Sequence, residues 1–294
     1  FRFLIPAMFG SAEKFNDNYL YPIQKMDDKD VVQELRRKIY PFILRRLKKD
    51  VLKELPDKIE QTLYVEMSEP QAKYYEQRRL FYKDAINQQV ASKGIQQAQF
   101  FIFQAMNELR QIASVPESQT DNRIQSPKLE LLVEQLEDAI ANKHKVLVFA
   151  NYLAAVDLIG EELDKRGIDF VTMTGSTRNR QELVERFQND TECKVFILTL
   201  KTGGTGLNLT AATNVIHFDL WWNPAVETQA TDRAYRIGQK SNVMVHRFIT
   251  KNTFEEKIND MIQSKKALAE MTVSTGENWI GNLSNKELKD LFAI

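Results

Sequence analysis

The sequence predicts an α/β fold in which helices cover both faces of a parallel sheet, preceded by a mainly helical region. Five short apolar runs rich in Val, Ile and Phe occur from residue 145 onward, and helix-patterned stretches separate the first three. Near-continuous apolar strands that alternate with amphipathic helices are typical of a parallel sheet buried on both faces. The runs span residues 145–150, 169–174, 194–199, 214–219 and 243–249.

Residues 1–125 have a different pattern, which predicts helices joined by irregular connections. Helices are expected over 71–90 and 96–112, where the sequence is rich in helix-favouring residues. Residues 114–126 are polar and contain a proline, which indicates a loop. Basic residues cluster between 36 and 49. They form either a DNA contact or the solvated face of a connecting helix, and charge runs more often have the second role.

A regular alternation of elements begins at Ser126. Ser126 and Pro127 supply an N-cap and a first-turn proline for a helix that extends to about residue 140. Two further helices are expected over 153–166 and 178–189, and a capping-box pattern near Asn252 begins a final helix. We therefore expect a helical linker and protrusion region, a sheet-containing lobe and a C-terminal helix with a tail, over residues 1–125, 126–251 and 252–294.

Composition excludes several classes of protein. Forty Lys and Arg balance forty Asp and Glu, so net charge predicts no particular partner and only local patches matter. The single cysteine, Cys193, excludes an internal disulfide and a thiolate zinc site, and the three histidines are too far apart in sequence to indicate a metal site. No apolar run approaches the ~18 residues that span a membrane. We expect no metal site and no membrane partner.

Parallel sheets place functional loops at the carboxyl ends of their strands. This rule selects four loops, at 151–152, 174–177, 201–208 and 220–224. The third loop contains a glycine cluster whose exposed amides suit anionic oxygen, although a tight strand-to-helix turn explains such a cluster equally well.

Two arginines and a glutamine recur at helical spacing after Asn223-Pro224. Gln229, Arg233 and Arg236 fall at i, i+4 and i+7, which predicts that they share one face of a helix. Guanidinium groups there suit a triphosphate whose outer oxygens gain charge during phosphoryl transfer. The alternative is a solvated or salt-bridged helix face.

Several motifs occur in a fixed order: VLVFANY at 146–152, TGS at 174–176, GGTGLNLTAA at 203–212, DLWWNPAVE at 219–227 and QATDRAYRIGQ at 229–239. Together they resemble the second RecA-like lobe of the Swi/Snf family of helicase-like ATPases, which are superfamily-two DNA translocases. Residues 42–58 resemble the family's link into that lobe, and 253–271 resemble its brace helix. The resemblance covers nearly the whole chain.

The resemblance implies roles for individual residues. Arg233 and Arg236 match the arginine fingers that reach ATP held by the first lobe, and Gln229 and Gly206 match positions at the same interlobe nucleotide site. The positions that match DNA-tracking contacts are Lys201, Thr202 and Trp222, with Thr174 and Ser176 as weaker candidates. One of Trp221 and Trp222 is expected to be buried and the other functional.

The resemblance further implies a motor that uses ATP with Mg²⁺ to move along double-stranded DNA. The phosphate-loop pattern GxxxxGK[ST] is absent, and no Asp is followed by Glu. We therefore expect the first RecA-like lobe to lie upstream of Phe1 in the same protein and to hold most of the nucleotide. This chain alone is expected to be inactive.

Two other functions stay open: a lobe of a strand-separating DNA or RNA helicase, and a non-catalytic nucleic-acid- or protein-binding scaffold. We expect a monomer that acts in the cytoplasm on a prokaryotic nucleoid, or in the nucleus of a eukaryote.

Overall fold

A computed structural model describes residues 5, 7–26, 28–42, 55–93, 95–200, 202, 206–221 and 223–269. The chain divides into two compact units, Phe1–Lys53 and Glu54–Ile294, and each is described here by itself.

The first unit is a small group of helices. Its elements are α1 (Ala12–Phe15), the π-helical turn η1 (Asn16–Leu20), α2 (Tyr21–Met26), α3 (Lys29–Ile39) and the 3₁₀ turn η2 (Tyr40–Phe42). Part of the predicted basic cluster lies in the last turn of α3, where cations complement the helix dipole. There Lys38 pairs with Glu34 at 2.6 Å, and Arg36 and Arg37 are exposed. Residues 45–49 of the cluster lie outside the described part of the chain.

The second unit contains a six-stranded, entirely parallel sheet in the order β1-β6-β5-β2-β4-β3. The predicted α/β class with a parallel sheet is therefore confirmed. The five predicted apolar runs correspond to β2–β6, and a further strand, β1, comes from the region expected to be helical. The strands are β1 (Lys58–Val65), β2 (Val146–Phe149), β3 (Phe170–Met173), β4 (Val195–Leu198), β5 (Asn214–His217) and β6 (Val243–Thr250).

The strand β1 was not predicted from the sequence. It lies at one edge of the sheet and, within the described residues, pairs with β6 alone, from Lys58 opposite Val243 to Val65 opposite Thr250. Most of its side chains are exposed or half-buried, so it lacks the apolar pattern of the central strands. The division of the chain near residues 125 and 251 stays a prediction.

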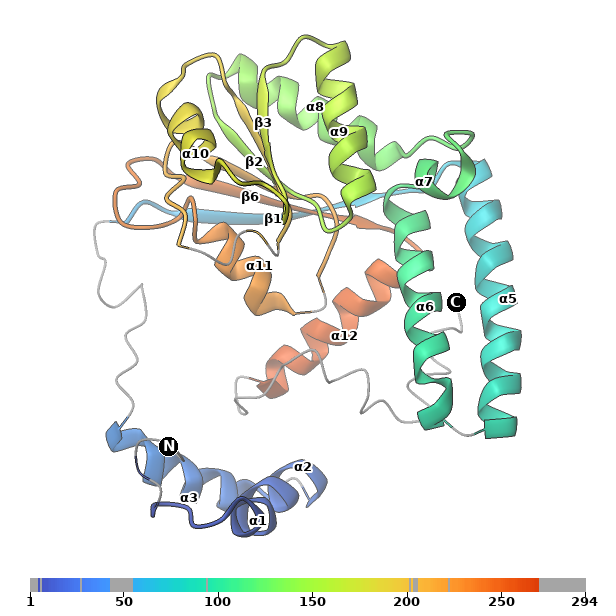
Figure 1. The fold of residues 1–294 in the computed structure, drawn as a ribbon, viewed down its shortest axis with the longest axis vertical. Coiled ribbons are helices and arrows are strands. Elements are labelled where there is room, and N and C mark those ends of the chain that lie inside the picture. The colour runs from blue at the N-terminus through green and yellow to red at the C-terminus, as the bar shows by residue number, and fades with distance from the viewer. Residues whose placement is uncertain are drawn as a thin grey trace. The chain divides into compact units, whose positions relative to one another are not determined.

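Helices cover both faces of this sheet, as predicted (Figure 1). The helices α8 (Pro127–Ala141) and α9 (Leu153–Lys165) pack on one face together with Val146 and Val148 of β2. The helices α10 (Arg180–Asn189) and α11 (Pro224–Thr231) pack on the other face with Leu147 and Phe149. Successive side chains of a strand point to opposite faces, which explains why neighbouring β2 residues enter different cores.

Three helices form a separate bundle beside the sheet. The two predicted helices of the protrusion region are α5 (Glu69–Lys93) and α6 (Ile95–Ser114), and α12 (Phe254–Ala269) packs against them. Tyr75, Met106 and Phe254 are buried where the helices meet. The expected loop over 114–126 contains one short helix, α7 (Glu117–Thr120).

A buried ion pair joins the bundle to the sheet. Lys128, at the start of α8, lies 2.5 Å from Glu255 of α12, and both side chains are only 1% exposed. Glu255 also accepts hydrogen bonds from the Ser114 hydroxyl of α6 at 2.7 Å and from the Thr250 amide of β6 at 2.9 Å. A buried charge is tolerated only where such partners surround it.

Removing one partner of this pair should destabilise the fold strongly. Glu255→Gln leaves the Lys128 ammonium buried without its counter-charge, so we expect the free energy of unfolding to fall by about 3–5 kcal/mol. Chemical denaturation of the wild type and the variant measures this difference. The control is Glu137→Gln, which breaks an exposed pair with Arg166 and should change stability little. Equal losses for both variants would contradict the assigned importance of the buried pair.

Candidate functional site

The four predicted loops follow β2, β3, β4 and β5. Because the strands are all parallel, these loops leave the sheet at the same edge. The sheet thus brings together segments that are widely separated in sequence, from residue 151 to residue 224.

The loop after β3 holds the two weaker DNA-contact candidates, Thr174 and Ser176. The hydroxyls of Thr174 and Ser176 lie 3.0 Å apart in an exposed turn, which the Thr177 hydroxyl closes by accepting the Thr174 amide. Thr174 is half-buried and Ser176 is exposed, and their DNA contacts stay predictions. Lys201 and residues 203–205 lie outside the described part of the chain.

Thr202 is buried in the loop after β4. Its side chain is 3% exposed, and its hydroxyl donates to the carbonyl oxygens of Met173 and Thr199, at 3.2 and 2.6 Å. In this conformation the hydroxyl ties the loop after β4 to the end of β3. The expected DNA contact of Thr202 stays a prediction.

The expectation of a single helix face carrying Gln229 and both arginines is wrong. The helix α11 ends at Thr231, and tight turns carry Arg233 and Arg236. The reason is a tertiary bond: the Arg233 carbonyl accepts the Leu209 amide at 3.0 Å, so it is engaged outside any helical ladder. Gln229 stays on the exposed side of α11 and, within the described residues, bonds to neither arginine.

The two arginines nevertheless lie beside each other against the segment that follows β4. The Arg236 guanidinium donates to the carbonyl oxygens of Gly206 and Leu207, at 3.3 and 3.0 Å. The Nε of Arg233 is buried and has no hydrogen-bond partner among the described residues. Burial and the adjacent Arg236 charge lower the pKa of Arg233, and Asp232 partly offsets them. Among the described residues, no carboxylate forms an ion pair with either arginine.

Gln239 fixes this arginine segment, a role that the sequence analysis did not assign. Its buried amide donates to the carbonyl oxygens of Thr210, Ala212 and Ala234, and its oxygen accepts the amides of residues 240 and 241. Gly238, at φ +97°, makes the turn that brings Gln239 back to the core. The only sequence signal for this role is the glutamine that ends the QATDRAYRIGQ motif.

Gly206 is the second position where the backbone requires glycine. Its φ is +34°, and a Cβ atom there would meet nothing within 4 Å. The backbone is therefore open on one side while its carbonyl accepts Arg236. The place of Gly206 at the nucleotide site stays a prediction.

The loop after β5 is anchored on both sides of position 222. Asp219 accepts the Asn151 amide at 2.9 Å, and the Trp221 amide donates to Glu227 of α11 at 2.8 Å. Trp221 is half-buried against the core on the α10–α11 face. Trp222 lies outside the described residues, so its predicted DNA contact stays a prediction.

Two buried titratable groups lie at the end of β5. Burial raises the pKa of Asp219 to about 7, although the nearby Arg110 charge opposes this. Burial also lowers the pKa of His217 to about 3, so this imidazole is neutral in the native protein at pH 7. It stacks on Phe149 and shares a 2.9 Å hydrogen bond with the Thr231 hydroxyl. His217 therefore serves packing and not acid–base chemistry.

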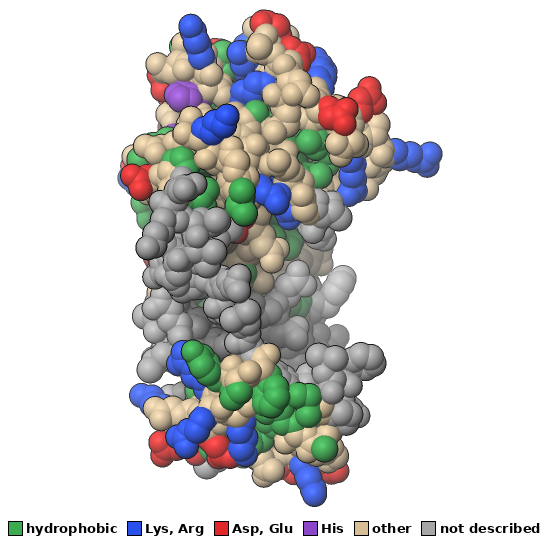
Figure 2. Space-filling model, turned by 90° about the vertical axis from the view of Figure 1, so that its left-hand side faces the viewer, with side chains coloured by type: hydrophobic (Ala, Val, Ile, Leu, Met, Phe, Trp, Pro, Cys, Tyr) green, Lys and Arg blue, Asp and Glu red, His purple; other side chains and the backbone are tan. Residues whose placement is uncertain are grey.

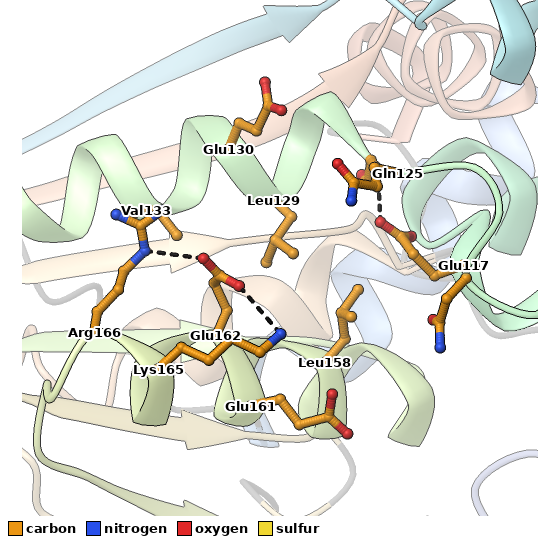
Figure 3. A pocket seen from close by; sticks show the side chains of 12 residues that line it. Glu117, Gln125, Leu129, Glu130, Val133, Leu158, Glu161, Glu162, Lys165 and Arg166 are labelled. Carbon is orange, nitrogen blue, oxygen red and sulfur yellow. Dashed lines mark hydrogen bonds and ion pairs between the residues drawn. The ribbon is translucent and has the colours of Figure 1, made fainter.

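A groove of about 440 Å³ lies elsewhere, between α8 and α9 (Figure 3). Glu117, Glu130 and Glu161 line it, and Glu162 is engaged by Lys165 and Arg166 at 3.7 and 3.0 Å. The helices that border this groove cover one face of the sheet, whereas the arginine segment packs with the core of the other face. The groove is thus separate from the predicted site residues.

Three observations on the described residues concern surface charge, metal ligands and membrane-spanning helices. On the face drawn in Figure 2, basic and acidic side chains are interspersed and no broad basic patch is visible on the described surface. No three His, Cys, Asp or Glu side chains gather as a metal site in the described ranges. No described helix is both long and apolar enough to cross a membrane.

Asp219 makes stability depend on pH. Between its unfolded-state pKa, near 3.8, and its native pKa of about 7, the native state holds a proton that the unfolded state has released. Rising pH therefore favours unfolding through this group, by up to a few kcal/mol in all. We expect the Asp219→Asn variant to gain stability relative to the wild type as pH increases from 4 to 7. A difference in unfolding free energy that is constant with pH would contradict the raised pKa.

Known protein families match two parts of the chain. Residues 1–118 match the SNF2-related domain, and residues 127–238 match the helicase conserved C-terminal domain. YwqA of Bacillus subtilis, a protein named for ATP-dependent helicase or translocase activity, is 40% identical over 305 residues. That match covers 100% of this chain and 32% of the relative. MOT1 of Saccharomyces cerevisiae, a TATA-binding protein-associated factor, is 30% identical, with 99% of this chain and 19% of the relative covered.

A solved structure gives the same assignment. The SWI2/SNF2 ATPase core of Sulfolobus solfataricus, solved with double-stranded DNA, superimposes with a TM-score of 0.69 at 33% identity. The match covers 99% of this chain and 62% of that one. The chain thus spans a part of the proteins it resembles. The two family matches, the arginine segment and the shared fold lead to one conclusion: the chain belongs to the Swi/Snf family of helicase-like ATPases.

Proposed function

We propose that this chain is the second motor lobe of an ATP-dependent translocase or remodeller that moves along double-stranded DNA. In this proposal Arg233 and Arg236 act on ATP that a first RecA-like lobe of the same protein holds. ATP binding closes the two lobes, and hydrolysis releases them. Alternating closure with both lobes on DNA moves the motor along the duplex.

One observation carries this proposal: Arg233 and Arg236 lie side by side with no carboxylate partner among the described residues, and the buried Nε of Arg233 is unbonded. Leaving a buried donor without a partner is costly, and two adjacent guanidinium groups repel each other. An anion that enters this place removes both penalties. The outer phosphates of a nucleotide have the required charge and acceptor oxygens.

The two arginines also supply the positive charge that stabilises phosphoryl transfer. Negative charge grows on the oxygens of the transferred phosphoryl group, and preorganised guanidinium groups stabilise that charge. Gln239 holds the Arg233–Arg236 segment before the nucleotide arrives, so little reorganisation is needed. Gly206 leaves room beside the arginines, and Gln229 faces outward from α11, where a second lobe can reach it.

The described residues of this chain suit the outer phosphates of ATP, but they do not suit the phosphate cradle or the Mg²⁺ ion. The arginines suit the outer phosphates, but the sequence has no phosphate-loop lysine, and the described residues form no metal-binding group. We assign the phosphate cradle and the metal to the first lobe, where Mg²⁺ would neutralise phosphate charge. This chain alone should therefore show negligible ATP hydrolysis.

The DNA-contact proposal rests on the carboxyl edge of the sheet. Thr174 and Ser176 present hydroxyls there, and Lys201 and Trp222 belong to neighbouring loops. Such contacts to the sugar-phosphate backbone give binding that is independent of sequence and weakens with salt. The Sulfolobus core was solved with double-stranded DNA, which supports this partner. The motor would act on the nucleoid in a prokaryotic cytoplasm, or in a eukaryotic nucleus.

Arginine variants of the complete protein test the proposal. Arg233→Ala and Arg236→Ala should each lower kcat for DNA-stimulated ATP hydrolysis about a thousandfold, because arginine fingers contribute on this scale. DNA affinity, measured by fluorescence anisotropy without nucleotide, should stay near the wild-type value.

The matched control is Arg166→Ala, which removes an exposed arginine that pairs with Glu137 and Glu162. It should leave kcat near the wild-type value. Wild-type turnover in either arginine-finger variant would contradict the assigned role.

A further inference from the structure

Ile237 is an apolar side chain that the segment carrying the two arginines exposes. It follows Arg236 directly and has 72% of its surface exposed, whereas its neighbours Ala234 and Gln239 are buried. Isolated exposed apolar residues are common and by themselves indicate nothing. Ile237 needs a reason because of its place, in a turn that is held rigidly beside the arginines.

The turn has four residues, with Ile237 as the second. The Arg236 carbonyl accepts the Gln239 amide at 3.0 Å, which closes the turn. Gly238, the third residue, has a φ of +97°, and a positive φ at this position is what a type II turn requires. Turn positions are dominated by Gly, Pro, Asn, Asp and Ser. Turn formation therefore explains Gly238 but not Ile237.

This turn is anchored by bonds that use no guanidinium group. The Gln239 side chain donates to the carbonyl oxygens of Thr210 and Ala212, at 3.1 and 2.9 Å. The Leu209 amide donates to the Arg233 carbonyl at 3.0 Å. The turn can thus keep its place when the guanidinium groups engage another molecule. A side chain on such a turn loses little conformational entropy when a partner covers it.

The surface around the turn is open and positively charged. A Cβ atom at Gly238 would meet no described atom within 4 Å. Lys240 is exposed, and Arg236 is half-buried. The turn therefore presents the Ile237 side chain between basic residues. A complementary surface has an apolar depression with acidic groups or acceptor oxygens at its rim.

The first RecA-like lobe is the partner that this place selects. In the proposed function Arg233 and Arg236 reach a nucleotide held by that lobe, so the lobe comes up to the turn that begins at Arg236. This chain covers 62% of the Sulfolobus ATPase core, so that core contains further protein. The backbone of DNA is a poorer partner for Ile237, because it is charged and binds mainly through polar contacts.

We propose that Ile237 is an apolar docking contact for the first lobe, so that part of the stability of the closed motor does not depend on the nucleotide. This inference rests on the proposed function, in which the two lobes close on ATP. Burial of an aliphatic side chain stabilises a contact whether or not phosphate is present. The arginines contribute only when the outer phosphates are there. One movement thus seats Ile237 and brings the arginines to the nucleotide.

The test is closure of the complete protein, measured by energy transfer between fluorescent labels on the two lobes. A non-hydrolysable ATP analogue is titrated at saturating double-stranded DNA, which gives the concentration of analogue that closes half of the molecules. Ile237→Ser should raise this half-closing concentration about tenfold, the scale of losing one buried aliphatic side chain. Ile237→Leu keeps the apolar volume and should stay within about twofold of the wild type.

The matched control is Ile59→Ser, the same substitution at an apolar residue of β1 that is 45% exposed. Leu63 of this strand packs with the core on the α8–α9 face, and Ile59, four residues earlier, points to the same face. Arg233 and Arg236 belong to the other face, so Ile59→Ser should leave closure unchanged. Thermal unfolding of Ile237→Ser should match the wild type, because the side chain is exposed in this lobe.

The Arg233→Ala background separates docking from an indirect effect on the arginines. There Ile237→Ser should again raise the half-closing concentration about tenfold, because the apolar contact does not involve the Arg233 guanidinium. If it causes no further rise, Ile237 acts only by placing Arg233, and the docking role is overturned.

The outcomes separate the two proposals. If the arginine-finger variants lose turnover but Ile237→Ser closes at the wild-type concentration, the docking role is overturned while the proposed function stands. An equal effect of Ile59→Ser would overturn it too. So would weaker DNA binding by Ile237→Ser without nucleotide, which would assign the side chain to DNA. If the arginine-finger variants keep wild-type turnover, the proposed function fails, and the docking role fails with it.

Discussion

The all-parallel sheet is the constraint on which the rest of the structure depends. It requires each connection to cross a face of the sheet, which places α8 and α9 on one side and α10 and α11 on the other. It also gathers the carboxyl ends of β2 to β5 at one edge. The candidate DNA contacts follow those ends, whereas the arginine segment runs along the α10–α11 face. The two proposed roles thus belong to two different surfaces of one sheet-containing layer.

The helical bundle is joined to that layer by polar contacts that are unusually well buried. Lys128 and Glu255 link α8 to α12, and the hydroxyl of Ser114 brings α6 into the same network. Arg110 forms a second link, four residues earlier on α6, to the loop after β5. Ionic and polar contacts, as well as apolar packing, therefore join the bundle to the sheet. Such links resist sliding better than apolar packing does, because each has a defined direction.

Much of the fold follows from sequence pattern, and the exceptions have physical causes. The strands β2 to β6 and the helices α5, α6, α8, α9, α10 and α12 were predictable from apolar periodicity and caps. The strand β1 was not, because most of its side chains are exposed or half-buried and it has no continuous apolar run. The end of α11 was not, because the Leu209 amide that engages the Arg233 carbonyl lies 24 positions earlier in the chain. The inward turn of Thr202 and the contacts of Gln239 likewise depend on tertiary structure.

The central claim is that Arg233 and Arg236 give up contacts within this lobe and bind a nucleotide that is held by the first lobe. The most direct measurement is a structure of the complete protein bound to double-stranded DNA and a non-hydrolysable ATP analogue. We predict guanidinium nitrogens of both arginines about 2.7–3.2 Å from the outer phosphate oxygens, with Arg236 released from the carbonyl oxygens of Gly206 and Leu207. A closed complex in which Arg236 keeps those carbonyl bonds and neither arginine reaches the nucleotide would contradict the account.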